Sequence, residues 1–174
     1  MATMKNIPLI LIGCGGVGRQ LLQHIVSCRS LHAKLGIHLR VVGVCDSKSL
    51  VVASDVLSNE LNDNFLSEVF LVKVDGSSLL TLGGLGECQV FKNSELKEKV
   101  IDVASVMGKS TGLAVVDCSA SSETVGVLTR VVDLGCCIVL ANKKPLTSTM
   151  PLDRLCYRKL TWKHFSVIKL IQCH

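Results

Sequence analysis

Aromatic residues are scarce in this chain: they make up 3% of its 174 residues, with one Trp and one Tyr. Proteins that bind single-stranded nucleic acid stack bases on aromatic rings. Nucleic acid is therefore not an expected partner, despite a net charge of +5. The hydrophobic share is nevertheless 48%, which predicts an aliphatic core large enough for one ordinary domain.

The chain also lacks a signal-peptide pattern and any apolar run long enough to cross a bilayer. We therefore expect no membrane partner and a cytoplasmic protein. No transit peptide is seen, and a plastid location is left open as the alternative.

The cysteine pattern lacks the marks of a disulfide framework or a metal centre. The nine cysteines are an odd number with no C-x-x-C spacing, and several lie in or beside strand-like segments. We expect them to be small buried hydrophobic residues in a reducing environment, with no metal site.

The strongest motif is the segment 7–18, IPLILIGCGGVG, in which an apolar run leads directly into a glycine loop. Gly13, Gly15 and Gly18 satisfy G-x-G-x-x-G, with Cys14, Gly16 and Val17 between them. The pattern predicts a buried parallel strand, a tight turn at Gly13, a backbone that a pyrophosphate can approach at Gly15, and close helix packing at Gly18. The alternative is a glycine turn that only packs tightly.

A second β-branched run, residues 39–45, ends in Asp46. An acidic residue at this place in a βαβ unit is a candidate to hold the adenosine ribose hydroxyls, and a turn or helix-capping aspartate is the alternative. Lys48 follows closely and could pair with a 2′-phosphate. The choice between NAD and NADP stays open.

Two further buried strands are predicted at residues 113–117 and 136–140. Ser119 follows the first and is a candidate ligand contact, whereas Ser121 or Ser122 is expected to cap the helix 123–134. Lys143 and its neighbour follow the second strand, either as ligand contacts or as solvated loop charges.

The intervening segment is less regular. We expect an amphipathic helix within residues 50–69, a short apolar run at 70–74, a surface loop at 75–86 and a helix that is capped at Ser94 and ends at Gly108. The resulting fold class is α/β, a doubly wound parallel sheet of the Rossmann NAD(P)-binding kind. Its crossovers would place the glycine loop, Asp46, Ser119 and Lys143 along one edge.

Four ordered motifs within residues 7–150 together resemble homoserine dehydrogenase, most closely the plant type; they read GCGGVGRQLLQHIVSCRSLH, VVGVCDSKSLV, VVDCSAS and VLANKKPLTSTM. The resemblance implies NAD(P)-dependent interconversion of L-aspartate-4-semialdehyde and L-homoserine, in threonine and methionine biosynthesis. It also implies that the glycine loop with Val17 holds the pyrophosphate. Ser119 with Ala120 would line the nicotinamide side, and Lys143 would meet the cofactor and substrate edge.

The resemblance ends after residue 150, where members of this family continue into a substrate and dimerisation domain. Residues 151–174 form a divergent basic tail with five Lys and Arg and one acid. We therefore expect residues 1–150 to be an NAD(P)-binding domain without the second substrate domain. The tail would be a product of alternative splicing, intron read-through or a gene-model error, and the alternative is a genuine divergent helix.

Such a chain would supply cofactor binding but no catalytic residue, and it would take an amino-acid substrate only if a second domain is supplied. The alternative is a non-catalytic dinucleotide-binding fragment that interacts with full-length subunits through an apolar patch in the tail, formed by Trp162, Phe165, Ile168 and Leu170. Another Rossmann enzyme and a homo-oligomer also remain open.

Overall fold

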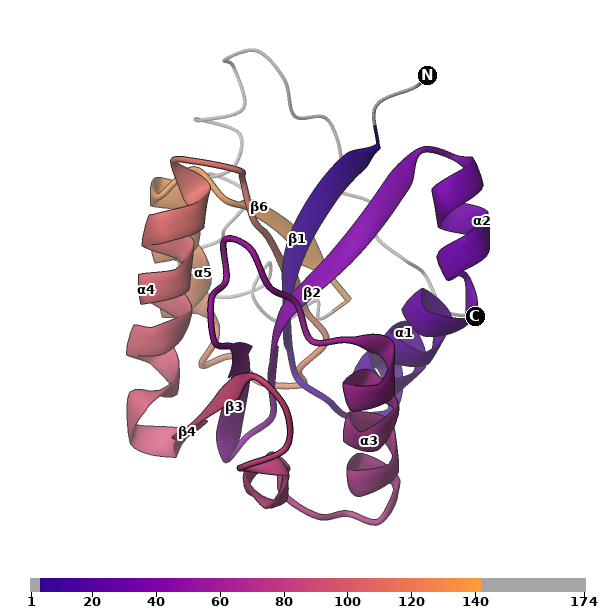
Figure 1. Cartoon of the computed structure of the whole chain (residues 1–174). Helices are drawn as coiled ribbons and strands as arrows, with labels where there is room; N and C mark the ends of the chain where they lie inside the picture. Colours follow the sequence, from indigo (N-terminus) through magenta and orange to yellow (C-terminus); the bar gives the residue numbers. More distant parts are fainter. Residues whose placement is uncertain (1–3, 142–174) are drawn as a thin grey trace.

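The computed structural model describes residues 4–141, which fold as one six-stranded sheet with helices on both faces (Figure 1). The elements follow in the order β1 (Lys5–Ile12), α1 (Gly16–Ser27), α2 (Arg29–Lys34), β2 (Ile37–Cys45), β3 (Ser49–Ala53), α3 (Asp63–Val74), η1 (Leu79–Leu82), β4 (Cys88–Lys92), η2 (Asn93–Glu95), α4 (Leu96–Gly108), β5 (Ala114–Asp117), α5 (Val125–Asp133) and β6 (Cys137–Leu140).

The strand order is β4-β3-β2-β1-β5-β6. Strand β1 pairs in parallel with β2 on one side and with β5 on the other, and β5 pairs in parallel with β6. The predicted α/β, Rossmann-like class is confirmed. The expectation of a fully parallel sheet is corrected, because β3 runs antiparallel to β2 and β4 runs antiparallel to β3.

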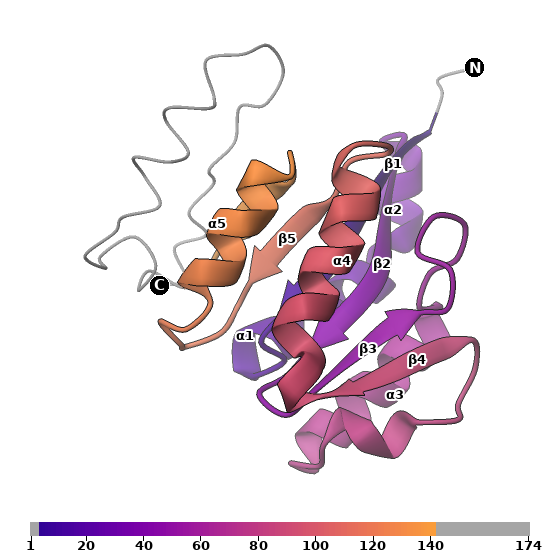
Figure 2. The same ribbon diagram turned by 90° about the vertical axis from the view of Figure 1, so that its left-hand side faces the viewer.

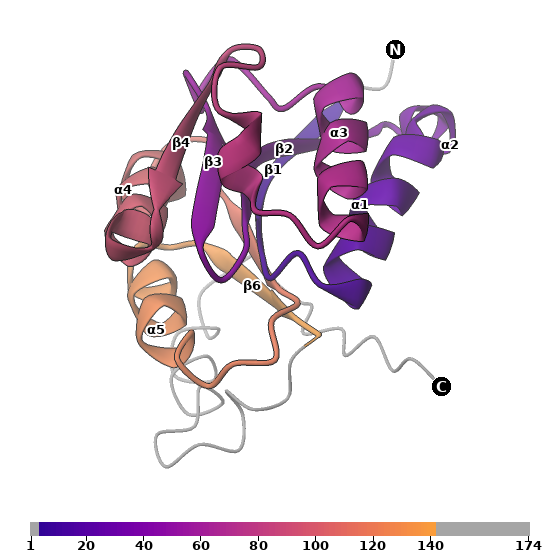
Figure 3. The same cartoon turned by 90° about the horizontal axis from the view of Figure 1, so that it is seen from below.

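The sheet is the middle layer of three. Helices α4 and α5 cover one face, and α1 and α3 cover the other (Figures 2 and 3). Successive residues of β1 point to opposite faces, so Ile10 and Ile12 join the core under α4 and α5, whereas Leu9 and Leu11 join the core under α1 and α3. This two-sided burial explains why residues 7–12 of β1 form an unbroken apolar run.

The segment between β2 and α4 differs most from the sequence prediction. Strands β3 and β4 are both missing from that prediction, and residues 70–74 are the end of α3 rather than a separate run. The expected surface loop 75–86 contains η1, in which Leu79 and Leu82 are buried. The sequence shows no hairpin signal for β4, because β3 and β4 pair across residues 54–87, far beyond a tight turn.

The ends of α4 and α5 agree with the prediction to within one or two residues, whereas α3 begins and ends later than predicted. Helix α4 begins at Leu96 with no side-chain cap from Glu95, so the expected Ser94 cap is wrong. Helix α5 ends at Asp133, and Gly135 follows with a φ of +86°. A glycine in this left-handed conformation commonly terminates a helix.

Candidate functional site

A pocket of about 1060 Å³ opens where β1, β2 and β5 reach their carboxyl ends. Helix α1 follows β1 onto one face, and α5 follows the neighbouring β5 onto the other, so the chain leaves the sheet in opposite directions at this point. Ligands of doubly wound sheets bind in the crevice that such a switch point creates.

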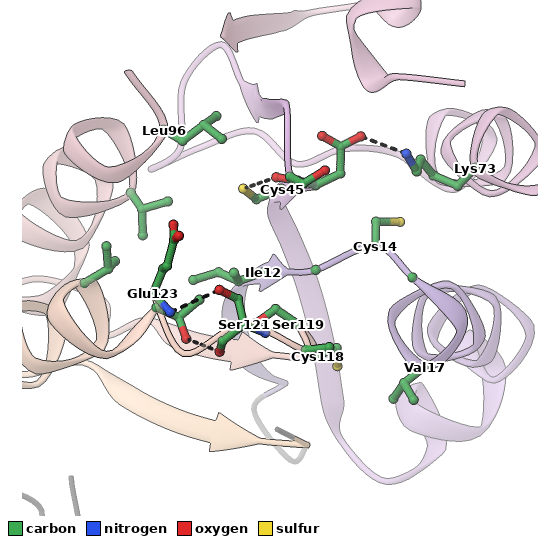
Figure 4. A pocket seen from close by; sticks show the side chains of 18 of the residues that line it. Ile12, Cys14, Val17, Cys45, Lys73, Leu96, Cys118, Ser119, Ser121 and Glu123 are labelled. Carbon is green, nitrogen blue, oxygen red and sulfur yellow. Dashed lines mark hydrogen bonds and ion pairs between the residues drawn. The ribbon is translucent and has the colours of Figure 1, made fainter. Parts of the chain in front are cut away.

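The pocket is lined by the glycine loop, the end of β2, the end of α3, the start of α4 and the segment between β5 and α5. Its lining residues are Ile12, Gly13, Cys14, Gly15, Gly16, Val17, Arg19, Cys45, Asp46, Ser47, Lys73, Gly76, Leu96, Lys97, Val100, Cys118, Ser119, Ala120, Ser121, Ser122, Glu123, Thr124 and Val127. In Figure 4, Leu96 and Glu123 lie on one wall, and Lys73 and Val17 lie on the opposite wall.

Two glycines of the loop are required by the fold itself. Gly13 has a φ of +90°, and a Cβ there would lie 2.5 Å from the backbone nitrogen of Ser119. A Cβ on Gly18 would lie 2.1 Å from the carbonyl oxygen of Gly13. The turn is also tied to β2, because the Gly13 amide donates to the Cys45 carbonyl at 2.8 Å. Gly13 therefore makes the tight turn, and Gly18 lets α1 approach the loop; Gly18 lies behind the pocket.

Gly15 and Gly16 are different, because a Cβ on either would meet no atom within 4 Å. Gly15 has a φ of −85° and a ψ of −156°, an extended conformation open to any residue. Neither backbone strain nor packing within the described chain accounts for these two glycines. Because Gly15 and Gly16 have no side chains, the space above their backbone is open on the pocket side of the loop.

The N-terminus of α1 faces this space without a cap. Within residues 4–141 no side chain accepts a hydrogen bond from its first amides, and its first turn holds no acidic residue. Amides at a helix start lack intrahelical acceptors, and the helix dipole adds a partial positive charge. An anion placed over Gly15 and Gly16 would accept hydrogen bonds from these amides and would be attracted by the partial positive charge.

The Asp46 carboxylate lies at the turn between β2 and β3 and is only 8% exposed. Its Oδ1 accepts from the amides of Lys48 and Ser49, each at 2.8 Å, and from the Ser49 hydroxyl at 2.9 Å. Its Oδ2 accepts from the Lys73 ammonium at 2.8 Å. These hydrogen bonds fit the alternative interpretation of Asp46, an aspartate that stabilises a turn. A contact between Asp46 and a ribose stays a prediction.

The ionisation of Asp46 follows from these partners. Burial by itself would raise the pKa of the carboxyl, but the hydrogen bonds from Lys73, Lys48 and Ser49 hold that pKa below its usual value. Asp46 is therefore a carboxylate at neutral pH.

Two cations stand at the same end of the pocket. The Lys73 ammonium donates to the Ser77 carbonyl at 2.9 Å as well as to Asp46. The Arg19 guanidinium donates to the Lys73 carbonyl at 3.2 Å, linking α1 to α3. Sequence reasoning missed both as site residues. Lys73 is 27 positions from Asp46, and no local pattern marks it.

The segment after β5 is held by Asp117, which is fully buried. Its carboxylate accepts from the Ser119 amide at 2.8 Å and from the Thr124 hydroxyl at 2.9 Å. Ser119 and Ala120 line the pocket, as the sequence placed them. The Ser121 hydroxyl accepts from the Glu123 amide at 3.0 Å, just before α5 begins.

An apolar wall also escaped the sequence analysis. Leu96 and Val100 come from α4 and Val127 from α5, and all three belong to the buried core on that face of the sheet. At the rim, the ammonium of Lys97 lies 4.0 Å from the carboxylate of Glu123, and both side chains are exposed. The wall arises only when α4 and α5 pack side by side, which no single motif indicates.

Three thiols line the pocket, those of Cys14, Cys45 and Cys118. Burial raises the pKa of Cys14 to about 11, that of Cys45 to about 12 and that of Cys118 to about 11. These thiols are protonated at neutral pH and are poor nucleophiles. Among residues 4–141 every cysteine is free, and no cluster of His, Cys, Asp or Glu is arranged to hold a metal.

Three predicted site residues are not brought to the pocket by the described structure, and the first, Gly18, lies behind it. Lys48 is exposed and is not among the lining residues; its contribution is the backbone amide that binds Asp46. Lys143 lies outside the described residues, as do the tail 151–174 and its apolar residues. None of the helices in the described part of the chain is long and apolar enough to span a membrane.

The sheet order, the two helical layers and the pocket at the switch point define a Rossmann-like α/β fold. No family model matches the chain, and no curated protein matches it. Solved structures do match. A hyperthermophilic archaeal homoserine dehydrogenase in complex with NADPH aligns at 20% identity and a TM-score of 0.57, over 81% of this chain and 37% of that one.

A mutant of a hyperthermophilic archaeal homoserine dehydrogenase, also in complex with NADPH, aligns at 18% identity and a TM-score of 0.53, over 87% of this chain and 40% of that one. A Candida auris protein of unknown function aligns at 18% identity and a TM-score of 0.54, over 83% of this chain and 32% of that one. The chain thus spans less than half the length of each. At these identities the matches establish the fold.

Proposed function

We propose that the pocket binds a nicotinamide dinucleotide, NADP or NAD, with its pyrophosphate over the glycine loop. The observation that carries the proposal is the uncapped N-terminus of α1 facing open space above Gly15 and Gly16. A pocket of about 1060 Å³ has room for an extended dinucleotide. The NADPH complexes of the two archaeal neighbours support the same ligand class.

The residues that would hold the cofactor follow from their places around the pocket. The amides of Gly15, Gly16 and Val17 would bind the pyrophosphate, and the end of β2 at Asp46 would lie beside the adenosine ribose. Ser119 and Ala120, at the end of β5, would line the nicotinamide side. The nicotinamide supplies the hydride or accepts it.

We further propose that the reaction served is that of homoserine dehydrogenase, the interconversion of L-aspartate-4-semialdehyde and L-homoserine. The four motifs of the sequence and the two archaeal neighbours support this choice. Reduction of the aldehyde also needs a positioned proton donor, and we assign none among residues 4–141. The described domain would therefore supply the cofactor half of the site.

Titration of NADPH and NADH, followed by the fluorescence of the reduced nicotinamide, tests the binding site. Gly15→Val fills the open space without straining the backbone, since its φ is −85° and a Cβ there meets no atom within 4 Å. Losing one charge-assisted hydrogen bond costs about 1.5–3 kcal/mol, roughly a ten- to hundredfold loss of affinity. We expect a loss of at least this size, with the far-UV circular dichroism unchanged.

Gly126→Val is the matched control. Gly126 lies exposed in α5, a Cβ there also meets nothing within 4 Å, and the residue does not line the pocket. It should leave binding unchanged. Undiminished affinity in Gly15→Val would show that the glycine loop is only a packing turn.

The reaction is tested separately, by NADPH-dependent reduction of aspartate-4-semialdehyde with the 174-residue chain. We expect cofactor binding with little or no turnover. Measurable turnover would contradict the proposal that this chain supplies only the cofactor half of the site.

A further inference from the structure

Cys28 lies at the junction of α1 and α2, and its thiol is placed differently from the other described thiols. The residue follows the end of α1, precedes α2 and is half-buried. Its Sγ lies 3.6 Å from Nδ1 of His24, a residue one helical turn earlier that is exposed. A thiol within hydrogen-bond distance of an imidazole can pass its proton to the ring, and the resulting thiolate is the nucleophilic form.

None of the other thiols in residues 4–141 is hydrogen-bonded to a side chain that could take its proton. The thiols of Cys45, Cys88, Cys136 and Cys137 donate to main-chain carbonyl oxygens. Burial raises the pKa of Cys88 and of Cys137, and it raises the pKa of Cys136 to about 11. Cys28 is therefore the described thiol best placed to react with a molecule from solvent.

His24 belongs to a row of side chains on successive helical turns, which continues through Cys28 to His32. The His32 ring packs edge-on against the His24 ring, with the centroids 6.1 Å apart and an interplanar angle of 68°. Nδ1 of His32 is buried and has no hydrogen-bond partner within residues 4–141. Buried polar atoms are nearly always paired, so this cluster has a hydrogen-bonding position left for a bound molecule.

We propose that Cys28 is a thiol modification site, at which His24 acts as the base and the co-reactant is a small peptide disulfide of the glutathione type. The amides and carboxylates of such a molecule are hydrogen-bonding partners for the histidine rings. The site is separate from the cofactor pocket, which is lined by the start of α1. Cys28 follows the other end of this 12-residue helix, about 18 Å away at 1.5 Å per residue.

The exchange balances without a further reagent. The thiol proton of Cys28 passes to Nδ1 of His24, and the thiolate attacks one sulfur of the disulfide. The bond between the two glutathione sulfurs breaks as one of them bonds to Sγ of Cys28, and the departing thiolate takes the proton. Cys28 is thereby oxidised to a mixed disulfide, and the other half of the glutathione disulfide is reduced to a thiol.

The test follows the mixed disulfide at each cysteine when the reduced whole chain is incubated with glutathione disulfide, by acid quenching and peptide mass spectrometry. The urea-unfolded chain gives the rate of each thiol without its folded surroundings. An ordinary thiol, with a pKa near 8.5, is only about 3% ionised at pH 7, which leaves room for a base to raise the rate. We expect Cys28 to react at least about threefold faster in the native chain than in the unfolded chain. The buried Cys14 and Cys45 should react far more slowly in the native chain.

His24→Gln removes the base and keeps a polar side chain. The rate at Cys28 should fall at least about threefold at pH 7, and the difference from the unaltered chain should vanish at about pH 9.5, where thiols ionise without a base. His38→Gln is the matched control, because His38 also bonds a neighbouring side chain, Glu60 at 3.0 Å, but lies in β2. It should leave the rate at Cys28 unchanged.

Two results would each overturn the proposal. One is a rate at Cys28 that is no higher in the native chain than in the unfolded chain, a comparison that needs no variant. The other is a His24→Gln chain that has unchanged far-UV circular dichroism and an unchanged rate at pH 7. Neither result bears on dinucleotide binding, and failure of dinucleotide binding would leave the Cys28 site standing.

Discussion

Replacing Gly18 with alanine tests the packing of α1 against the glycine loop. The added Cβ would lie 2.1 Å from the Gly13 carbonyl oxygen and 3.1 Å from its carbonyl carbon. An ordinary carbon–oxygen contact is at roughly 3.3 Å. Since both neighbours are backbone atoms, no side chain can swing away, and α1 must move about 1 Å from the loop.

The energetic cost of that movement can be estimated from the side chains that α1 packs into the core. Leu22 and Ile25 are each 1% exposed and pack into the core beneath the helix. Forcing a well-packed interface apart costs up to about 3 kcal/mol. Alanine recovers about 0.8–1 kcal/mol relative to glycine inside a helix. The free energy of unfolding should therefore fall by about 2 kcal/mol in Gly18→Ala.

Urea unfolding followed by far-UV circular dichroism measures this loss. With a denaturant slope of about 2 kcal/mol per molar for a domain of this size, the midpoint should fall by about 1 M. Gly15→Ala and Gly16→Ala are internal controls, because neither Cβ meets an atom within 4 Å. Their midpoints should stay within about 0.3 M of the unaltered chain, the scatter of neutral surface changes. A Gly18→Ala midpoint equal to theirs would refute the close approach.

Three other changes probe the electrostatics and the core. Because Lys73 and its neighbours hold the pKa of Asp46 below its usual value, the stability that Asp46 adds is present above about pH 3.9 and is lost as the pH falls through the folded pKa. Urea midpoints of Asp46→Asn and the unaltered chain should converge in acid, and a gap unchanged at pH 3 contradicts the argument. Cys14 is only 3% exposed, and this burial raises the pKa of its thiol to about 11. Iodoacetamide at neutral pH should therefore modify Cys14 far more slowly in the native than in the urea-unfolded chain by mass spectrometry; equal rates would contradict its burial. Leu128 is fully buried in α5, so Leu128→Ala should lower the free energy of unfolding by about 2–5 kcal/mol, and a midpoint like that of the unaltered chain would place Leu128 outside the core.

The part of the fold that sequence reasoning recovered is the part with the simplest signals. Strands β1, β2, β5 and β6 each contain an apolar run, at residues 7–12, 41–45, 114–116 and 137–140, because parallel strands are buried on both faces. Strand β4 is instead a half-exposed edge strand, in which Gln89 and Lys92 are exposed and the other residues are half-buried. Its partner β3 lies 35 residues earlier, beyond α3 and η1. Pairing over that distance is decided by tertiary packing rather than by local pattern.

The candidate site likewise contains residues that could be located from the sequence and residues that could not. The glycine loop could be located because three of its functions, the turn, the open backbone and the close helix, each demand glycine at a fixed spacing. Ser119 could be located because it directly follows a predicted strand. Lys73 could not, since it reaches the pocket only when the end of α3 packs beside α1, where Arg19 binds its carbonyl.

Asp46 shows that a position readable from the sequence does not by itself fix the role of the residue. Its place after β2 is readable from the sequence, but a carboxylate there can either accept hydrogen bonds from a ligand or be consumed by the protein. In the described structure the amides of Lys48 and Ser49 and the ammonium of Lys73 all donate to this carboxylate. The motif therefore indicates where a pyrophosphate would lie, whereas the surroundings of the carboxylate after β2 depend on a lysine from another element of the fold.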